Sequence, residues 1–146
     1  MHEYLVAKEL APNLYGYTKM DGTPTAYVME YLDPSEWETL YRSMNENSTV
    51  LFCTELQKAL EDIVSALKSK NYIYNDLQPN NIMIYKDLLK QPLDLMVINY
   101  NWVKEISKVY YPAEQNLEIT GIKWPGEARG NIESDHGWKL ISFWLQ

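Results

Sequence analysis

Cysteine is nearly absent from this chain, and several other features are missing altogether. The single cysteine, Cys53, excludes an internal disulfide framework and any metal site built from several thiolates. No stretch comes near the roughly 18 uninterrupted apolar residues of a membrane-spanning helix. The first residues also lack the long apolar core of a signal peptide. We therefore expect an intracellular, cytoplasmic protein with no membrane segment.

Basic side chains are also few. The chain carries 13 Lys and Arg against 20 Asp and Glu, a formal net charge of −7. Binding to a nucleic-acid backbone needs clustered Lys and Arg, so we expect no nucleic-acid partner. The 46% apolar and 23% charged content is that of an ordinary soluble protein. A chain of 146 residues then predicts one domain, residues 1–146, with a real hydrophobic core.

The first third of the chain predicts two short helices around a hairpin. Residues 3–10 have one apolar side at helical spacing. Two strand-like runs follow at 14–19 and 25–32, and Asp21-Gly22 between them is a strong signal for a tight turn. Pro34-Ser35 then opens a second helix that runs through about Met44, with the serine as its cap.

The remainder is organised around one long helix. Residues 50–70 give the clearest helical pattern, with Leu56, Leu60, Ile63, Val64 and Leu67 on one face. After it we expect a short strand at Tyr72-Ile73, a second hairpin with strands at 82–85 and 95–98, an irregular stretch from 110 to about 134, and a last helix capped by Ser134 or Asp135 that ends at Leu145. The predicted class is α+β.

The segment from Tyr74 to Asn81 places Asp76 five residues ahead of Asn81, directly after the long helix. Enzymes that transfer the terminal phosphate of ATP use this spacing. The Asp accepts a proton from the substrate hydroxyl, and the Asn holds a magnesium ion against the phosphates. An Asp beside Pro and Asn is otherwise an ordinary turn former. The following segment carries amides, Asn99 and Asn101, where a metal-binding carboxylate is expected.

Taken in order, these elements resemble the protein-kinase-like superfamily over residues 3–146. The tail segments Tyr111-Pro112, 122–125 and 135–138 are similar to compact kinase-like proteins of fungi. The resemblance implies a protein-kinase-like fold with a partial small lobe and hinge at residues 1–32. It implies an abbreviated, mainly helical large lobe at 33–146.

The resemblance also implies a set of site residues. Asp76 stands at the position of the catalytic base, and Asn81 and Asn99 stand at the two metal-binding positions. The implied cofactors are ATP and Mg²⁺. The hinge that hydrogen-bonds adenine corresponds to Met29, Glu30, Tyr31 and Leu32.

Several departures from the family pattern bear on activity. No glycine-rich loop precedes residue 3, and no strand carries the lysine that pairs with the phosphates. Tyr74 and Asn75 replace the usual His and Arg, and Glu3 stands in the small-lobe helix without its lysine partner. Asn99 replaces the magnesium-binding Asp. An amide supplies no charge to this hard cation, so the barrier to phosphotransfer should rise by several kcal/mol, or several orders of magnitude in rate.

Two hypotheses follow. The first is a catalytically impaired, pseudokinase-like domain that acts through binding, with a protein partner or a second copy covering the place of the missing strands. The second is an ATP-dependent Ser/Thr-type protein kinase whose missing strands lie in a longer parent chain. For other conspicuous residues we expect ordinary packing. His2 and His136 should lie at the surface or its boundary, Cys53 should be buried, and Trp124, Trp138 and Trp144 should pack at the core.

Overall fold

The computed structural model describes residues 1–19, 21–22, 25–46, 53–74, 76–87, 93–99, 103–106, 109–111 and 124–145. Several predicted features lie outside these residues. They are Asn75, Asn101, residues 112–123 of the irregular stretch from 110 to 134, and the side chains of Cys53 and Trp144.

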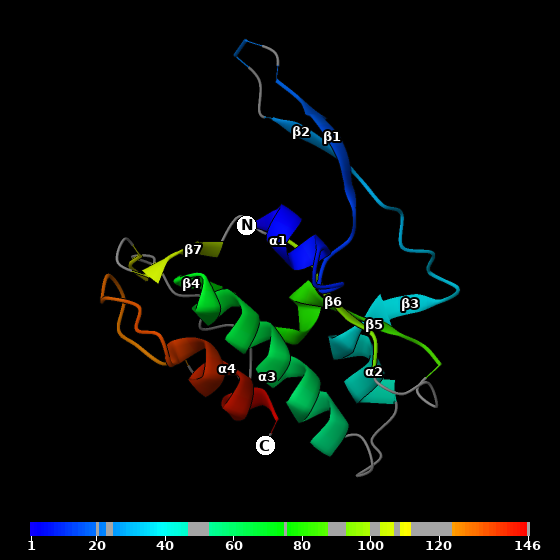
Figure 1. The fold of residues 1–146 in the computed structure, drawn as a ribbon. Coiled ribbons are helices and arrows are strands. Elements are labelled where there is room, and N and C mark those ends of the chain that lie inside the picture. Colours follow the sequence, from blue (N-terminus) through cyan, green and yellow to red (C-terminus); the bar gives the residue numbers. More distant parts are fainter. Residues whose placement is uncertain are drawn as a thin grey trace.

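The described residues form helices and three small antiparallel sheets, so the predicted α+β class is confirmed (Figure 1). The sheets pair β1 with β2, β3 with β5 and β6, and β4 with β7. Among the described helices, none has both the length and the apolar character needed to cross a membrane. In chain order the elements are α1 (His2–Val6), β1 (Leu14–Thr18), β2 (Ala26–Met29), β3 (Trp37–Thr39), α2 (Leu40–Glu46), α3 (Cys53–Ser69), β4 (Tyr72–Tyr74), the 3₁₀ turn η2 (Pro79–Asn81), β5 (Ile82–Tyr85), β6 (Leu95–Val97), β7 (Val103–Glu105) and α4 (His136–Trp144).

Helix α3 forms the centre of the core, as its apolar spacing predicts. Four of the five residues expected on its inner face are buried, and Val64 is partly buried against them. Helix α3 packs against α4 and β4, and the buried ends of β5 and β6 complete the cluster. Each large aliphatic side chain buried here contributes about 1.5–3 kcal/mol to stability. This cluster is the platform for the loops that follow β4 and β6.

The predicted helix at 34–44 is wrong in its first half. The Asp33 Oδ1 atom accepts hydrogen bonds from the Ser35 backbone N–H (2.8 Å) and hydroxyl (2.7 Å), which closes a turn. Residues 37–39 form β3, which pairs with β5, and Trp37 meets Tyr85 edge to face at 5.4 Å. The helix begins only at Leu40. Sheet pairing therefore overrides the local helical signal.

The first helix is also shorter than predicted, since α1 ends at Val6 rather than at residue 10. The chain then turns, and Glu9 adopts a left-handed conformation with φ +58°. This turn brings the Leu10 carbonyl to the Val97 backbone N–H at 2.9 Å, which ties the first segment to β6. The predicted strand at 72–73 is confirmed and extends to Tyr74, but its partner β7 was not predicted.

The predicted hairpin is confirmed, with β1 and β2 antiparallel and Gly22 in the turn at φ +76°. Strand β2 ends at Met29, three residues before the predicted end. Figure 1 shows this ribbon projecting away from the helices and the other strands. All four residues of β2 are exposed. The hairpin therefore has little packing of its own.

Candidate functional site

Three of the predicted site residues, Asp76, Asn81 and Asn99, come together. The Asn81 Nδ2 atom donates to the Asp76 carboxylate Oδ2 at 2.7 Å and to the Asp76 backbone carbonyl at 2.9 Å. The Asn99 Nδ2 atom in turn reaches the Asn81 Oδ1 atom at 3.4 Å. A continuous set of polar contacts thus links residues 76, 81 and 99.

The second hairpin explains why residues so far apart in the sequence meet. Asn81 ends the turn η2, whose first residue is Pro79, and it leads directly into β5. Asn99 follows β6 by two residues. Strands β5 and β6 pair with Ile82 opposite Val97, and the Ile98 N–H donates to the Asn81 carbonyl at 2.9 Å. The two asparagines therefore lie side by side at one end of the hairpin.

Two further residues hold this site, and the sequence reasoning assigned neither a role in it. The buried Gln78 donates from Nε2 to the other carboxylate oxygen, Asp76 Oδ1, at 2.6 Å. The buried Tyr74 hydroxyl lies 2.8 Å from the Ile98 carbonyl and 3.1 Å from the Asn99 carbonyl. Tyr74 thus joins the loop after β4 to the loop after β6. Its place two residues before Asp76 was visible in the sequence, but its long-range partners were not.

The electrostatics of Asp76 reflect two opposed influences. Partial burial raises the pKa of this carboxyl above its ordinary value, and the hydrogen bond from Asn81 lowers the pKa in part. Asn99 is held at φ +62°, a left-handed conformation that asparagine tolerates better than most residues. In this conformation the side-chain amide of Asn99 lies next to the Asn81 Oδ1 atom.

The donor set does not fit a magnesium ion as it stands. Mg²⁺ is ordinarily held by one or two carboxylates together with phosphate oxygens and water. Here the one carboxylate, Asp76, already accepts amide hydrogen bonds at both oxygens, at 2.6 and 2.7 Å. The Oδ1 atom of Asn81 faces the amide of Asn99, and Asn99 itself is neutral. A metal would have to displace these hydrogen bonds and would gain a single charged ligand.

The four predicted adenine-binding residues lie elsewhere, at the end of β2 and just beyond it. The Glu30 N–H donates to the Asn13 carbonyl at 2.7 Å. The Glu30 carboxylate accepts from the Asn13 N–H and side-chain amide at 3.0 and 2.7 Å. Glu30 therefore closes the base of the first hairpin. Met29 and Tyr31 are exposed, and Leu32 is partly buried.

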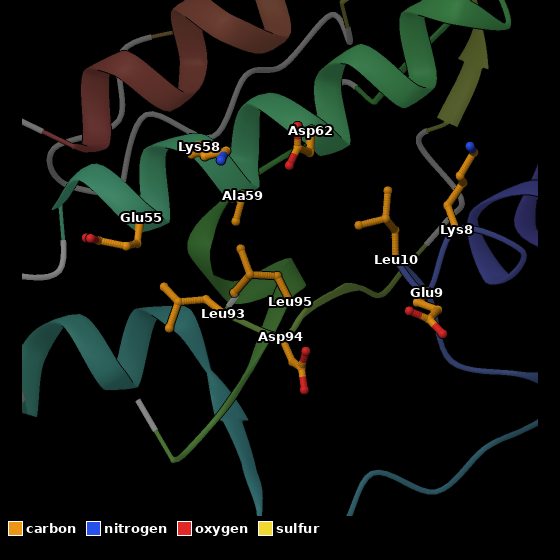
Figure 2. A pocket seen from close by; sticks show the side chains of 10 residues that line it. All are labelled: Lys8, Glu9, Leu10, Glu55, Lys58, Ala59, Asp62, Leu93, Asp94 and Leu95. Carbon is orange, nitrogen blue, oxygen red and sulfur yellow. The ribbon is translucent and has the colours of Figure 1, made fainter. Parts of the chain in front are cut away.

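A cavity of about 360 Å³ lies at a separate place, between the end of α1, the start of α3 and the start of β6 (Figure 2). None of the predicted site residues lines it. Its apolar floor is surrounded by charged side chains of both signs, as Figure 2 shows. The lining residues are Lys8, Glu9, Leu10, Glu55, Lys58, Ala59, Asp62, Leu93, Asp94 and Leu95. The size suits a small ligand, but the mixed charges select no chemical class.

The prediction for His136 is wrong, because this side chain is buried. Its ring stacks on Tyr111 at 5.7 Å, and the Tyr111 hydroxyl lies 3.0 Å from the His136 Nδ1 atom. Burial, and to a lesser degree the charge of Asp135, raises the pKa of Tyr111 to about 12. Trp124 meets the Tyr111 ring edge to face at 5.8 Å. His2, with Nε2 at 2.7 Å from the Pro12 carbonyl, is half-buried as expected.

The packing expected of the tryptophans is confirmed for Trp124 and Trp138, which lie partly buried against the two apolar clusters. Asp135 occupies the predicted capping position of α4, but its side chain makes no capping hydrogen bond. Compared with known proteins, the chain matches no protein-family model and no curated protein.

Proposed function

We propose that this chain is a protein-kinase-like domain that has lost efficient phosphotransfer and acts through binding. The observation that carries the proposal is the meeting of Asp76 and Asn81, from the loop after β4, with Asn99, from the loop after β6. In a kinase-like site the base and the two metal positions must converge in this way. The order of the surrounding elements, with a long helix, a polar loop and a hairpin, supports the same proposal.

Loss of phosphotransfer follows from the chemistry of the three side chains. The transferring phosphoryl group needs a metal ion to neutralise its developing charge. Asn99 brings no charge, and Asp76 is engaged by the amides of Gln78 and Asn81. Without the metal contribution the barrier rises by several kcal/mol, which is several orders of magnitude in rate. Binding, rather than turnover, is the function left to such a site.

The surface proposed for a protein partner, or for a second copy of the chain, is the first hairpin. Among the residues that the structure describes, six of the eight exposed large apolar side chains lie in or next to it. They are Tyr15, Tyr17, Tyr27, Val28, Met29 and Tyr31. A two-stranded ribbon alone in water is marginally stable, and an exposed apolar patch of this kind ordinarily marks an interaction surface. We therefore place the partner on this ribbon.

Thermal unfolding with nucleotide tests the proposal. A ligand that binds only the folded state raises its apparent stability. We expect ATP to give the wild-type chain no magnesium-dependent increase in melting temperature. Asn99→Asp restores a carboxylate and should strengthen Mg²⁺ binding at least tenfold. Asn80→Asp is the matched control, because it adds the same charge at an exposed position of the same turn.

Each result has a definite meaning. Saturable, magnesium-dependent stabilisation of the wild type by ATP would contradict the loss of metal binding. Equal Mg²⁺ affinity in the Asn99→Asp and Asn80→Asp variants would contradict the placement of Asn99 at a metal position.

The second candidate function is an active Ser/Thr-type kinase with Asp76 as base. One observation favours it, since burial raises the pKa of Asp76 and general bases often have a pKa shifted toward neutrality. In that case the wild type should show the magnesium-dependent response. Asp76→Asn should then abolish phosphate transfer while leaving nucleotide binding in place.

A further inference from the structure

We propose that His136, Glu133 and Asp135 form a site for a divalent transition-metal ion of the zinc type. One ligand atom from each of the three residues lies within 4.8 Å of the other two. The site stands at the start of α4 and is independent of the proposed kinase-like function. Imidazole nitrogen and carboxylate oxygen together are ligands that zinc accepts, whereas Mg²⁺ and Ca²⁺ prefer oxygen alone.

The imidazole of His136 is buried and is held in place through its Nδ1 atom. Its Nδ1 atom has two hydrogen-bond partners, the Tyr111 hydroxyl at 3.0 Å and the Glu133 backbone N–H at 3.3 Å. Within the described residues, its Nε2 atom makes no hydrogen bond and points between two carboxylates. The Glu133 Oε2 atom is 3.9 Å away and the Asp135 Oδ1 atom 4.0 Å away. Because the Glu133 N–H donates to Nδ1, the proton of the neutral ring lies on Nε2, between the two carboxylates. An ion on Nε2 would take the place of that proton. The Glu133 N–H would then have to turn away from Nδ1, so that Nδ1 could carry the ring proton and donate it to the Tyr111 oxygen.

The two carboxylates are free to complete the site. Asp135 bonds Lys139 through its Oδ2 atom at 2.8 Å, which leaves Oδ1 turned toward the imidazole. The Glu133 side chain is 71% exposed and can swing inward. In tetrahedral zinc, bonds of about 2.0–2.1 Å put neighbouring ligand atoms roughly 3.3–3.5 Å apart. Each carboxylate oxygen must therefore approach Nε2 by roughly half an ångström, and the two oxygens, which lie within 4.8 Å of each other, must approach by up to roughly 1.5 Å.

The packing behind the imidazole is close enough to fix its direction. A Cβ atom at Gly126 would lie 2.5 Å from the Tyr111 ring and 3.2 Å from the His136 ring. Only glycine therefore allows the chain to pass so near this pair. The backbone bonds from Tyr111 to Gly130 (3.0 Å) and from Ile132 to Val109 (3.1 Å) hold the two segments together. A rigid imidazole with mobile carboxylates is a partly preorganised metal site.

Acidic residues at the start of a helix have a simpler explanation, because they complement the helix dipole. That explanation accounts for Glu133 and Asp135 but not for the histidine. The His136 ring is buried, its Nδ1 atom is hydrogen-bonded and its Nε2 atom points outward. The helix dipole does not stabilise this arrangement. The dipole opposes a cation at this end of α4, and the two carboxylates offset that opposition.

Calorimetric titration of the whole chain with zinc chloride tests the site. A Cys53→Ser background removes the only thiol, which otherwise competes for zinc. We expect one zinc ion per chain in this background and no comparable binding of magnesium chloride. Glu133→Gln and Asp135→Asn should each weaken zinc binding at least tenfold. Glu127→Gln, the same chemical change at an exposed position nearby, should leave it unchanged.

Nuclear magnetic resonance of the two histidines gives a second readout that does not depend on the variants. Zinc should shift the Nε2 resonance of His136 and leave that of His2 in place. The proposal is overturned if zinc shows no saturable binding up to about 1 mM. It is also overturned if binding persists unchanged in both carboxylate variants, or if the shifted resonance belongs to His2.

Discussion

At the scale of the residue, the carboxylate of Asp76 is hydrogen-bonded at both oxygens, and yet burial destabilises its charged form. Two amides donate to its carboxylate, yet the net effect of its surroundings is to raise its pKa, with burial as the largest cause. The folded state therefore keeps the Asp76 proton to a higher pH than the unfolded chain does. The contribution of Asp76 to the free energy of unfolding falls as pH rises through the raised pKa.

The substitution Asp76→Asn should remove this pH dependence. Asparagine keeps one acceptor oxygen, and the amide of Gln78 or Asn81 can flip to accept from its new NH₂ group. We expect the slope of unfolding free energy against pH, from about pH 4 upward, to be flatter in the variant than in the wild type. Urea unfolding at a series of pH values measures it. Asp62→Asn, an exposed carboxylate on α3, is the control, and an equal change in both variants would refute the assignment to Asp76.

At the scale of the element, α2 illustrates how a cap decides where a helix begins. The Thr39 hydroxyl accepts a hydrogen bond from the Arg42 backbone N–H at 3.3 Å, the pattern of an N-cap residue with its third helical residue. Thr39→Ala should therefore lower the free energy of unfolding by about 1 kcal/mol. Thr39→Ser retains the hydroxyl and should lose much less. Chemical unfolding of both variants measures the difference, and an equal loss would place the effect in β3 rather than in the cap.

The elements that the sequence predicted well are those whose signal is local. Helix α3 follows from its own apolar spacing, and β5 follows from an apolar run beside a turn. Strand β3 was missed because three residues with a helical neighbourhood become a strand only through pairing with β5, about 45 residues later. Strand β7 was missed for the same reason, since it is defined by β4.

The same distinction holds for the candidate site. The spacing of Asp76 and Asn81 is local, and the structure brings both side chains into contact. Gln78 carries no pattern that distinguishes it from any loop glutamine. The role of His136 depends on Tyr111, 25 residues earlier, and no spacing rule connects these two residues. Contacts set by tertiary packing are therefore the part that sequence reasoning could not supply.

At the scale of the whole molecule, the structure consists of a packed body and a projecting ribbon. The body buries α3 together with α1, α4 and the central strands. The Glu30 and Asn13 contacts close the base of the ribbon of β1 and β2, and all four residues of β2 are exposed. Substitutions on the ribbon should therefore change association without changing the stability of the body. This separation allows the proposed interaction surface to be tested by itself.

The double variant Tyr17→Lys, Tyr27→Lys makes that test. The two rings face each other across the ribbon at 6.4 Å and are 71% and 59% exposed, so charged side chains fit there without disturbing the core. If a second copy covers the ribbon, the wild type should associate at concentrations of tens of micromolar, and the variant should remain monomeric by sedimentation velocity. Tyr41→Lys, at a similarly exposed tyrosine on α2, should behave as the wild type.

Association that survives in the double variant would place the contact elsewhere. A monomeric wild type would exclude the second copy and leave a different protein as the partner. In that case the electrostatic repulsion between two acidic chains would outweigh the attraction between their apolar ribbons.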